Sequence, residues 1–371
     1  MRITDVETII LRLPVVEMIA DGTQDALIVR VHTDEGVTGL GEVDASPEVI
    51  RAIIEAPASH ALSSGLRALL VGEDPMNVRR LWDTMYRGSI FFGRRGPVIM
   101  AMSGIDIALW DIVGQVTGRP VHEALGGGYR SRLRAYASTL MPHTPRDAAA
   151  EATRWVESGF RAIKLGWGGF GTAPDGGVAL VRAVRAAVGD QVDILLDIGF
   201  NWEPSRAIDY ARRLEEYRPF WIEEPFWPDN KEAYARLADT IDIPVAGGEE
   251  ETTRWAFQEL LDDGHVDVVQ PDVSRAGGFT EVQRIAEMAD LHGRPCVPHA
   301  WSTGILKAAS LHMNAAIPNA LMMEFCVWAG PLGDELTEQR FWIDENGEVE
   351  IPRTPGLGVT LREDVVARYR I

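Results

Sequence analysis

The stretch FWIEEPFWPDN, residues 220–230, places two adjacent carboxylates, Glu223 and Glu224, where an apolar run ends. Taken alone, such acids are ordinary solvated turn residues at the start of the next helix. Two other apolar runs, however, end in the same way. Asp197 lies 26 residues before Glu223, and Glu249 lies 26 residues after it. This repeat indicates three carboxylates that the fold holds at equivalent positions.

Carboxylates that converge on one place repel each other unless a cation neutralises them. A site of carboxylate oxygens, completed to an octahedron by water and substrate oxygens, favours Mg²⁺. We therefore predict that Asp197, Glu223 and Glu249 bind Mg²⁺, and that Glu224 lies behind them and orients Glu223. The alternative, three independent helix caps, requires the same register three times.

Polar residues also end three later apolar runs: Asp272 in QPDVSRAGG, His299 in VPHAWSTG and Glu324 in MMEF. A histidine beside a carboxylate is a stronger base and is held in one tautomer. We therefore predict that Asp272 and His299 form a base dyad. A lone histidine is more often structural, and this interpretation is kept for His32, His60, His122, His265, His292 and His312. His143 is a candidate substrate contact.

Eight short apolar runs, separated by helical patterns, make up the second part of the chain. The predicted strands are residues 133–138, 160–166, 192–197, 220–224, 243–249, 266–272, 294–299 and 320–325. Strands that alternate with helices form right-handed parallel βαβ units, and eight such units close a barrel. Active sites of such barrels lie at the C-terminal rim, which is where the polar residues fall.

The first part of the chain reads as strands followed by helices. Residues 25–43 are two β-rich runs joined by an Asp-Glu-Gly turn, which predicts a hairpin. The helical pattern at 96–118 is apolar almost all round, so we expect it to be buried between domains. A strand-and-turn segment after residue 330 is expected to return to the N-terminal domain.

Composition excludes several classes of function. The chain has 371 residues and a net charge of −19, which disfavours nucleic acid and anionic membrane surfaces as partners. We expect no apolar run to be long enough to span a bilayer, and the first residues lack the features of a signal peptide. Cys296 and Cys326 are predicted to be reduced core residues. The expected location is the cytoplasm.

Over essentially its whole length the chain resembles the mandelate racemase subgroup of the enolase superfamily. The motifs that carry the resemblance are SGIDIALWDIVGQVTGRPVHEALGG, LLDIGFNW, FWIEEP, PVAGGE, QPDVSRAGG and VPHAWSTG. The resemblance implies an α/β fold, a modified TIM (β/α) barrel under an N-terminal α+β capping domain. We expect the capping domain at 1–125, the barrel at 126–330, and a C-terminal segment at 331–371 that completes the cap.

The resemblance also implies a chemistry, the abstraction of the proton α to a carboxylate, with Mg²⁺ stabilising the resulting enediolate. It implies that Asp197, Glu223 and Glu249 hold the metal, and that Asp272 and His299 form the base dyad. Glu324 is implied to hydrogen-bond an oxygen of the substrate carboxylate. A homo-oligomer, between a dimer and an octamer, is the expected assembly.

One position departs from the subgroup's pattern. The subgroup usually has Lys-x-Lys at the second barrel strand, and its second lysine is a base on the opposite face of the substrate from the histidine. Here the sequence is IKLGWGG, so Lys164 is kept but Gly166 replaces the second lysine. We therefore predict that Lys164 neutralises the substrate carboxylate. One base suffices for β-elimination, which favours a hydro-lyase that dehydrates a sugar acid to a 2-keto-3-deoxy acid.

Three alternatives stay open at this stage: a cycloisomerase of a sugar-acid lactone or anhydro sugar acid, a racemase or epimerase, and a binding protein without turnover. Specificity is expected from capping-domain loops near 16–25 and 44–55. The candidate substrate-binding residues are Lys164, Glu324, Trp301, Asn201 and His143. Trp301 could stack on a sugar face or seal the rim from water.

Overall fold

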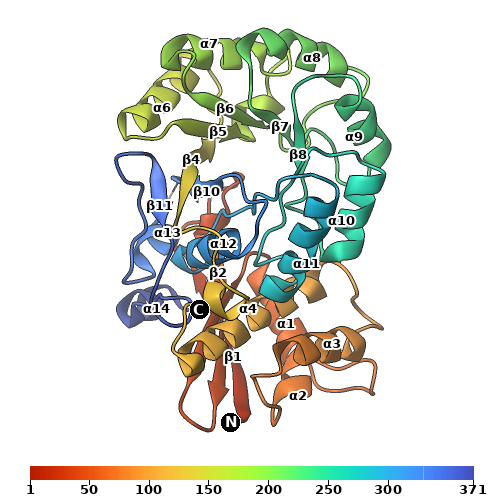
Figure 1. Cartoon of the computed structure of the whole chain (residues 1–371), viewed down its shortest axis with the longest axis vertical. Helices are drawn as coiled ribbons and strands as arrows, with labels where there is room; N and C mark the ends of the chain where they lie inside the picture. Colours follow the sequence, from red (N-terminus) through yellow and green to blue (C-terminus); the bar gives the residue numbers. More distant parts are fainter. Residues whose placement is uncertain (329) are drawn as a thin grey trace.

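The computed structural model describes residues 1–328 and 330–371. The chain folds into a small antiparallel sheet with its own helices and a parallel barrel surrounded by helices (Figure 1). One hydrophobic core lies between one face of the antiparallel sheet and the helices of the cap. A larger core fills the space between the barrel strands and their helices and continues onto the other face of the antiparallel sheet. This arrangement confirms the predicted modified TIM barrel with an N-terminal cap.

The capping sheet has the strand order β1-β2-β3, with all neighbours antiparallel. Its strands are β1 (Ile3–Arg12), β2 (Asp25–Thr33) and β3 (Thr38–Val43). The hairpin predicted within 25–43 is confirmed as β2 and β3. Strand β1 was not predicted, and it pairs with β2 along its whole length. The helices of this unit are α1 (Pro47–Glu55), α2 (Leu66–Leu70), α3 (Val78–Gly88), α4 (Pro97–Thr117) and α5 (Val121–Ala124).

The barrel sheet is parallel and runs in the order β10-β4-β5-β6-β7-β8-β9. Its strands are β4 (Arg132–Leu140), β5 (Ala162–Gly166), β6 (Asp193–Asp197), β7 (Trp221–Glu223), β8 (Val245–Gly247), β9 (Val268–Val269) and β10 (Met323–Cys326). The helices between them are α6 (Pro145–Glu157), α7 (Val178–Val188), α8 (Ala207–Leu214), α9 (Lys231–Ala238), α10 (Thr253–Asp262), α11 (Gly278–Leu291) and α12 (Gly304–Ala316).

The strand predicted at 294–299 is reduced to single bridges. Cys296 bridges Val269 on one side and Ala320 on the other, and these two bridges close the sheet into a barrel. Strands β8 and β9 are also shorter than predicted. Glu249 and Asp272 therefore lie just beyond their strand ends, whereas Asp197 and Glu223 are the last residues of β6 and β7.

An apolar layer fills the barrel interior directly below the polar rim. Its residues are Tyr136, Ala162, Leu195, Trp221, Ala246, Val268, Val297 and Met322. Because alternate residues of a strand face the same side, a residue two positions further on also points inward. That step leads from Leu195 to Asp197, from Trp221 to Glu223 and from Val297 to His299. The packed layer thus supports the functional side chains from beneath.

Helix α4 lies between the capping sheet and the barrel helix α11, as expected for its all-round apolar surface (Figure 1). Its length and composition are those of a membrane-spanning helix, so the expectation that no run reaches that length was wrong. In the folded chain 78% of its most apolar window is buried, which is typical of a core helix. Side chains of α4 reach both units: Trp110 Nε1 donates to Thr280 Oγ1 over 2.9 Å.

The C-terminal segment divides between the two units. It contains α13 (Pro331–Glu335), β11 (Glu348–Glu350) and α14 (Glu363–Tyr369). The segment was expected to return to the cap. Its strand β11 instead pairs antiparallel with the barrel strand β4. Helix α14 does reach the capping sheet, where the Ile371 backbone N–H donates to the Ile10 carbonyl over 3.1 Å. Strand β11 pairs with residues 132–134, the part of β4 that precedes its pairing with β10 and β5.

Asp111 of α4 joins three separate segments of the chain. Its buried carboxylate accepts hydrogen bonds from the Leu40 N–H at 2.9 Å and from the Leu357 N–H at 2.8 Å. We expect Asp111→Ala to lower the free energy of unfolding by about 2–5 kcal/mol, because two buried backbone donors lose their partners. Urea unfolding measures the loss, with Glu157→Ala on the exposed surface of α6 as the control. An equal response of the two variants would contradict this role.

Candidate active site

Three acidic side chains meet at the C-terminal rim of the barrel. Asp197 and Glu223 are direct neighbours in the register of β6 and β7, and Glu249 follows β8 by two residues. All three are buried, and one carboxylate oxygen of each lies within 4.8 Å of the others. The spacing along the sequence therefore becomes proximity in space, because equivalent positions on parallel strands meet at one rim.

The geometry of these carboxylates fits a hard divalent cation. Glu249 Oε2 is buried and has no hydrogen-bond partner among the described residues. Burial, followed by repulsion from Glu223, raises the pKa of Asp197 well above its ordinary value. A cation would satisfy the free oxygen and offset the repulsion, and a set of carboxylate oxygens is the chemistry that such cations prefer.

His299 and Asp272, the predicted base dyad, lie in direct contact. His299 Nδ1 lies 2.6 Å from Asp272 Oδ2, which leaves Nε2 facing the acid cluster, 3.6 Å from Glu249 Oε2. Asp272 is itself fixed by Ser274, whose N–H and hydroxyl both donate to Oδ1 over 2.6 Å. This chain of contacts holds the imidazole in one orientation, with Nε2 available on the pocket side.

The pKa of His299 reflects two opposing effects. Burial alone would lower it, but the carboxylates of Glu249, Glu324 and Asp272 outweigh burial and raise the pKa to about 10. Glu249 is the largest of the raising charges. A cation held by Glu249 would therefore lower the pKa of His299 toward the range in which an imidazole acts as a base.

Lys164 and Glu324 form a buried ion pair beside the acid cluster. Lys164 Nζ lies 2.7 Å from Glu324 Oε1 and 2.5 Å from Glu223 Oε1. Burial lowers the pKa of Lys164, but Glu223 and Glu324 outweigh it and hold that pKa well above its ordinary value. Glu324 also accepts hydrogen bonds from Ser138 Oγ at 2.7 Å and the Ala300 N–H at 2.8 Å. These contacts hold the ammonium in one position between Glu223 and Glu324.

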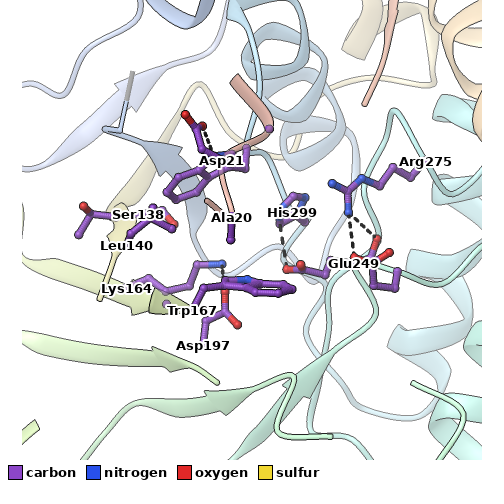
Figure 2. Close-up of a pocket in the computed structure, with 15 residues that line it drawn as sticks. Ala20, Asp21, Ser138, Leu140, Lys164, Trp167, Asp197, Glu249, Arg275 and His299 are labelled. Atoms are coloured by element: carbon purple, nitrogen blue, oxygen red, sulfur yellow. Dashed lines mark hydrogen bonds and ion pairs between the residues drawn. The ribbon is translucent and has the colours of Figure 1, made fainter. Parts of the chain in front are cut away.

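Lys164, Asp197, Glu249 and His299 line a cavity of about 340 Å³ at the rim. In Figure 2 Lys164 and Asp197 lie on one side of it, and His299 and Glu249 lie on the other. The capping loop that carries Asp21 crosses the opening beside Trp301. The cavity therefore places an imidazole, the Lys164 ammonium and an acidic cluster around a space that suits a small carboxylic acid.

Comparison with known proteins decides the family. Residues 3–126 match the mandelate racemase/muconate lactonizing enzyme N-terminal domain, and residues 147–365 match the enolase C-terminal domain-like family. The chain belongs to the mandelate racemase/muconate lactonizing enzyme family of the enolase superfamily. Enzymes of this superfamily use a divalent metal, and Asp197, Glu223 and Glu249 are the candidate site for it here.

Relatives within this family include named enzymes of two kinds. The chain is 33% identical to an arabinonate dehydratase of Saccharolobus solfataricus over 95% of its own length and 92% of that protein. It is 34% identical to a D-galactarolactone cycloisomerase of Agrobacterium fabrum, covering 93% and 91% of the two chains. The crystal structure of a 3,6-anhydro-D-galactonate cycloisomerase from Zobellia galactanivorans superposes with a TM-score of 0.91 at 31% identity, with both chains fully covered.

Gly166 marks where this chain departs from the family's lysine pair. The residue is paired with Asp197 in the register of β5 and β6, so a side chain there would point to the same rim. A Cβ atom built on Gly166 would lie 2.7 Å from Asp197 Oδ2 and 2.9 Å from Asp197 Cβ. Asp197 therefore occupies the space that a longer residue would need in this structure. The face of the pocket opposite His299 carries Lys164 but no second lysine at position 166.

Glu224 is placed differently from its predicted role. Its carboxylate accepts a hydrogen bond from Tyr234 Oη and another, at 2.6 Å, from the Gly248 N–H. Among the described residues its side-chain hydrogen bonds thus fix the loop before Glu249 rather than Glu223. Glu224 also has a φ of 41°, a left-handed conformation that costs energy for a non-glycine residue and that these bonds hold in place.

The predicted substrate contacts divide into two groups. Lys164 and Trp301 line the cavity, and Glu324 lies directly behind Lys164. Asn201 and His143 do not line it. The Asn201 amide donates to the Ile198 and Gly199 carbonyls of its own turn, and exposed His143 contacts Thr172 Oγ1 at 3.2 Å. Both side chains are used by local structure outside the cavity.

Several residues that support the site were not predicted. Trp221 Nε1 donates to Glu223 Oε2 over 2.9 Å, and its position two residues earlier on the same strand was a usable signal. Glu42 of the cap has no such signal. Its buried carboxylate accepts hydrogen bonds from Ser302 Oγ at 2.7 Å and the Leu306 N–H at 2.9 Å. The cap therefore holds the start of α12 and, with it, the loop that carries His299.

Proposed function

We propose that this chain is a Mg²⁺-dependent hydro-lyase that dehydrates a sugar acid to a 2-keto-3-deoxy acid. Two observations support the proposal: relatives named as sugar-acid dehydratases over more than nine-tenths of the chain, and a cavity with one oriented base. The observation that carries it is the His299–Asp272 dyad facing the acid cluster, with Gly166 on the opposite side. One base on one face suits an elimination and not a two-base racemisation.

In this proposal each side chain has a defined task. Asp197, Glu223 and Glu249 hold the Mg²⁺, which when bound polarises the substrate carboxylate and stabilises the charge that develops on it. Lys164 neutralises the same carboxylate from the other side, and Glu324, which lies behind Lys164, holds the ammonium in place. Trp301 covers the substrate where the capping loop meets the rim.

The proton then follows one path. His299 Nε2 takes the α-proton, and the C–H electron pair moves into the enediolate. The β carbon–oxygen bond breaks, and the leaving hydroxide departs as water with the proton that His299 carries. The resulting enol tautomerises to the 2-keto-3-deoxy acid. No oxidant or reductant is required, because the oxidation at one carbon balances the reduction at its neighbour.

A cycloisomerase is the second candidate, supported by the two cycloisomerases among its relatives. The same base serves that reaction, but the leaving group is the ring oxygen of a lactone or anhydro sugar acid instead of water. A protein without turnover is disfavoured by the complete dyad. We further propose a cytoplasmic homo-oligomer; the two free, buried cysteines are consistent with a reducing compartment.

A panel of sugar acids and sugar-acid lactones, incubated with enzyme and Mg²⁺, tests the proposal by chemical detection of 2-keto-3-deoxy acids. We expect product from open-chain acids; product from lactones or anhydro acids alone would favour the cycloisomerase. In deuterium oxide we expect α-hydrogen exchange with retention of configuration, since a single base returns the proton to the face it left. Accumulation of the α-epimer would show a second base and contradict the mechanism.

A further inference from the structure

The cavity lining outside Lys164 and the acid cluster has its own charge pattern. It includes Asp21, Glu250, Arg275 and Trp301, and we call these residues the distal wall. Figure 2 shows Asp21 on the capping loop and Arg275 beyond Glu249 on the other side of the cavity. In the proposed function the reacting carboxylate of the substrate lies near Lys164 and the acid cluster. The remaining carbons of a sugar acid must then extend toward the distal wall, whose charges decide what the far end of the substrate can be.

Arg275 is the cation of this wall, and its guanidinium is already engaged in ion pairs and hydrogen bonds within the protein. Its Nη2 lies 2.7 Å from Asp44 Oδ2, and its Nε donates to the Asp44 carbonyl over 3.1 Å. Its Nη1 donates to the Glu249 carbonyl over 3.3 Å and lies 3.6 Å from Glu250 Oε1. The Arg275 and Asp44 side chains are only 15% and 10% exposed, so this pair is held inside the protein.

The carboxylates of the wall, Asp21 and Glu250, are not neutralised to the same extent by cations among the described residues. Asp21 Oδ1 accepts from Trp301 Nε1 at 3.2 Å and from the Thr23 N–H at 2.9 Å, and no cationic partner of Asp21 is found in the described chain. Glu250 is 38% exposed, and among the residues that the structure describes its one ionic contact is the 3.6 Å approach to Arg275. With Arg275 neutralised by Asp44, the distal wall carries an excess of negative charge.

We infer that the substrate is an aldonic acid, with a single carboxylate and a neutral polyhydroxyl tail, and that the site rejects aldaric acids, which carry a second carboxylate. Sugar hydroxyls donate hydrogen bonds, and carboxylate oxygens are strong acceptors for them. A second substrate carboxylate would instead face like charges, which repel it and weaken binding. This inference rests on the proposed function, since it takes the acid cluster as the end where the reacting carboxylate binds.

Matched pairs of acids that differ only at the last carbon provide the test, such as D-galactonate with D-galactarate and D-gluconate with D-glucarate. We expect kcat/KM to favour the aldonate on the order of 100-fold in any pair that is turned over. Asp21→Asn and Glu250→Gln should each reduce this ratio, and so should added salt. Glu157→Gln removes the same charge on the exposed surface of α6 and should leave the ratio unchanged.

Equal or better turnover of the aldarate would overturn the inference while leaving the dehydratase function intact. Absence of keto acid from every pair would instead count against the proposed function. Calorimetric binding of the same pairs to His299→Asn with Mg²⁺ separates the two questions, because it needs no turnover. Tighter binding of the aldonate supports the inference, and tighter or equal binding of the aldarate refutes it, as does failure of both acids to bind.

Discussion

His299→Asn is expected to abolish both α-hydrogen exchange and elimination while the protein still folds and binds Mg²⁺. The imidazole is the group whose free nitrogen faces the acid cluster, and Asn supplies no base of useful strength. General base catalysis contributes about 10²–10⁴-fold, so activity should fall by at least that factor. Asp272→Asn should impair the same step, because it removes the charge that orients and supports the imidazolium across the 2.6 Å contact.

His265→Asn is a matched control for this experiment. His265 is exposed, contacts Asp239 at 3.0 Å, and has a φ of 55°, a conformation that Asn adopts readily. Its replacement should leave exchange and elimination at the wild-type rate. Exchange is followed by proton NMR in deuterium oxide, and metal binding by titration calorimetry. Stereorandom exchange persisting in His299→Asn would show that Lys164 or another group acts as a base.

Removal of the metal is expected to have the other large effect. Chelation should abolish turnover, and added Mg²⁺ should restore it. The reason is that Mg²⁺, when held by the acid cluster, would supply the positive charge that stabilises the enediolate. Mg²⁺ should also raise the melting temperature, since a ligand at 100 times its Kd stabilises the folded state by about 2.7 kcal/mol. This second readout needs no activity.

Glu223→Gln should lose both the Mg²⁺-dependent turnover and the rise in melting temperature on addition of Mg²⁺. The variant should fold, because a neutral amide relieves repulsion among buried carboxylates, and Trp221 Nε1 can still donate to the side-chain oxygen. Glu157→Gln on the surface of α6 should keep both the thermal shift and the activity. Full turnover by chelated wild-type enzyme, or an unchanged Mg²⁺ response in Glu223→Gln, would exclude the acid cluster as the metal site.

The sequence by itself determined the features that follow from regular strand geometry. In parallel strands of a barrel, a residue's distance from its strand end sets its height at the rim, so equal spacing brought Asp197, Glu223 and Glu249 together. The same rule placed His299 beside Asp272, although the strand before His299 is only a bridge at Cys296. The resemblance to the subgroup's Lys-x-Lys pattern identified Gly166 as the position without a second base, and strand register places Gly166 beside Asp197.

Only the tertiary structure decided which partners side chains find across long sequence separations. Glu42 reaches Ser302, and Asp44 reaches Arg275, from more than 200 positions away, and no local pattern encodes such contacts. Asn201 and His143 do not line the cavity, and their side chains contact neighbouring loop residues instead. Strand pairing likewise sent β11 to β4. The position of a residue relative to the end of its barrel strand fixes its height at the rim and the side to which it points. The paths of loops and the docking of the cap depend instead on the packing of the whole chain.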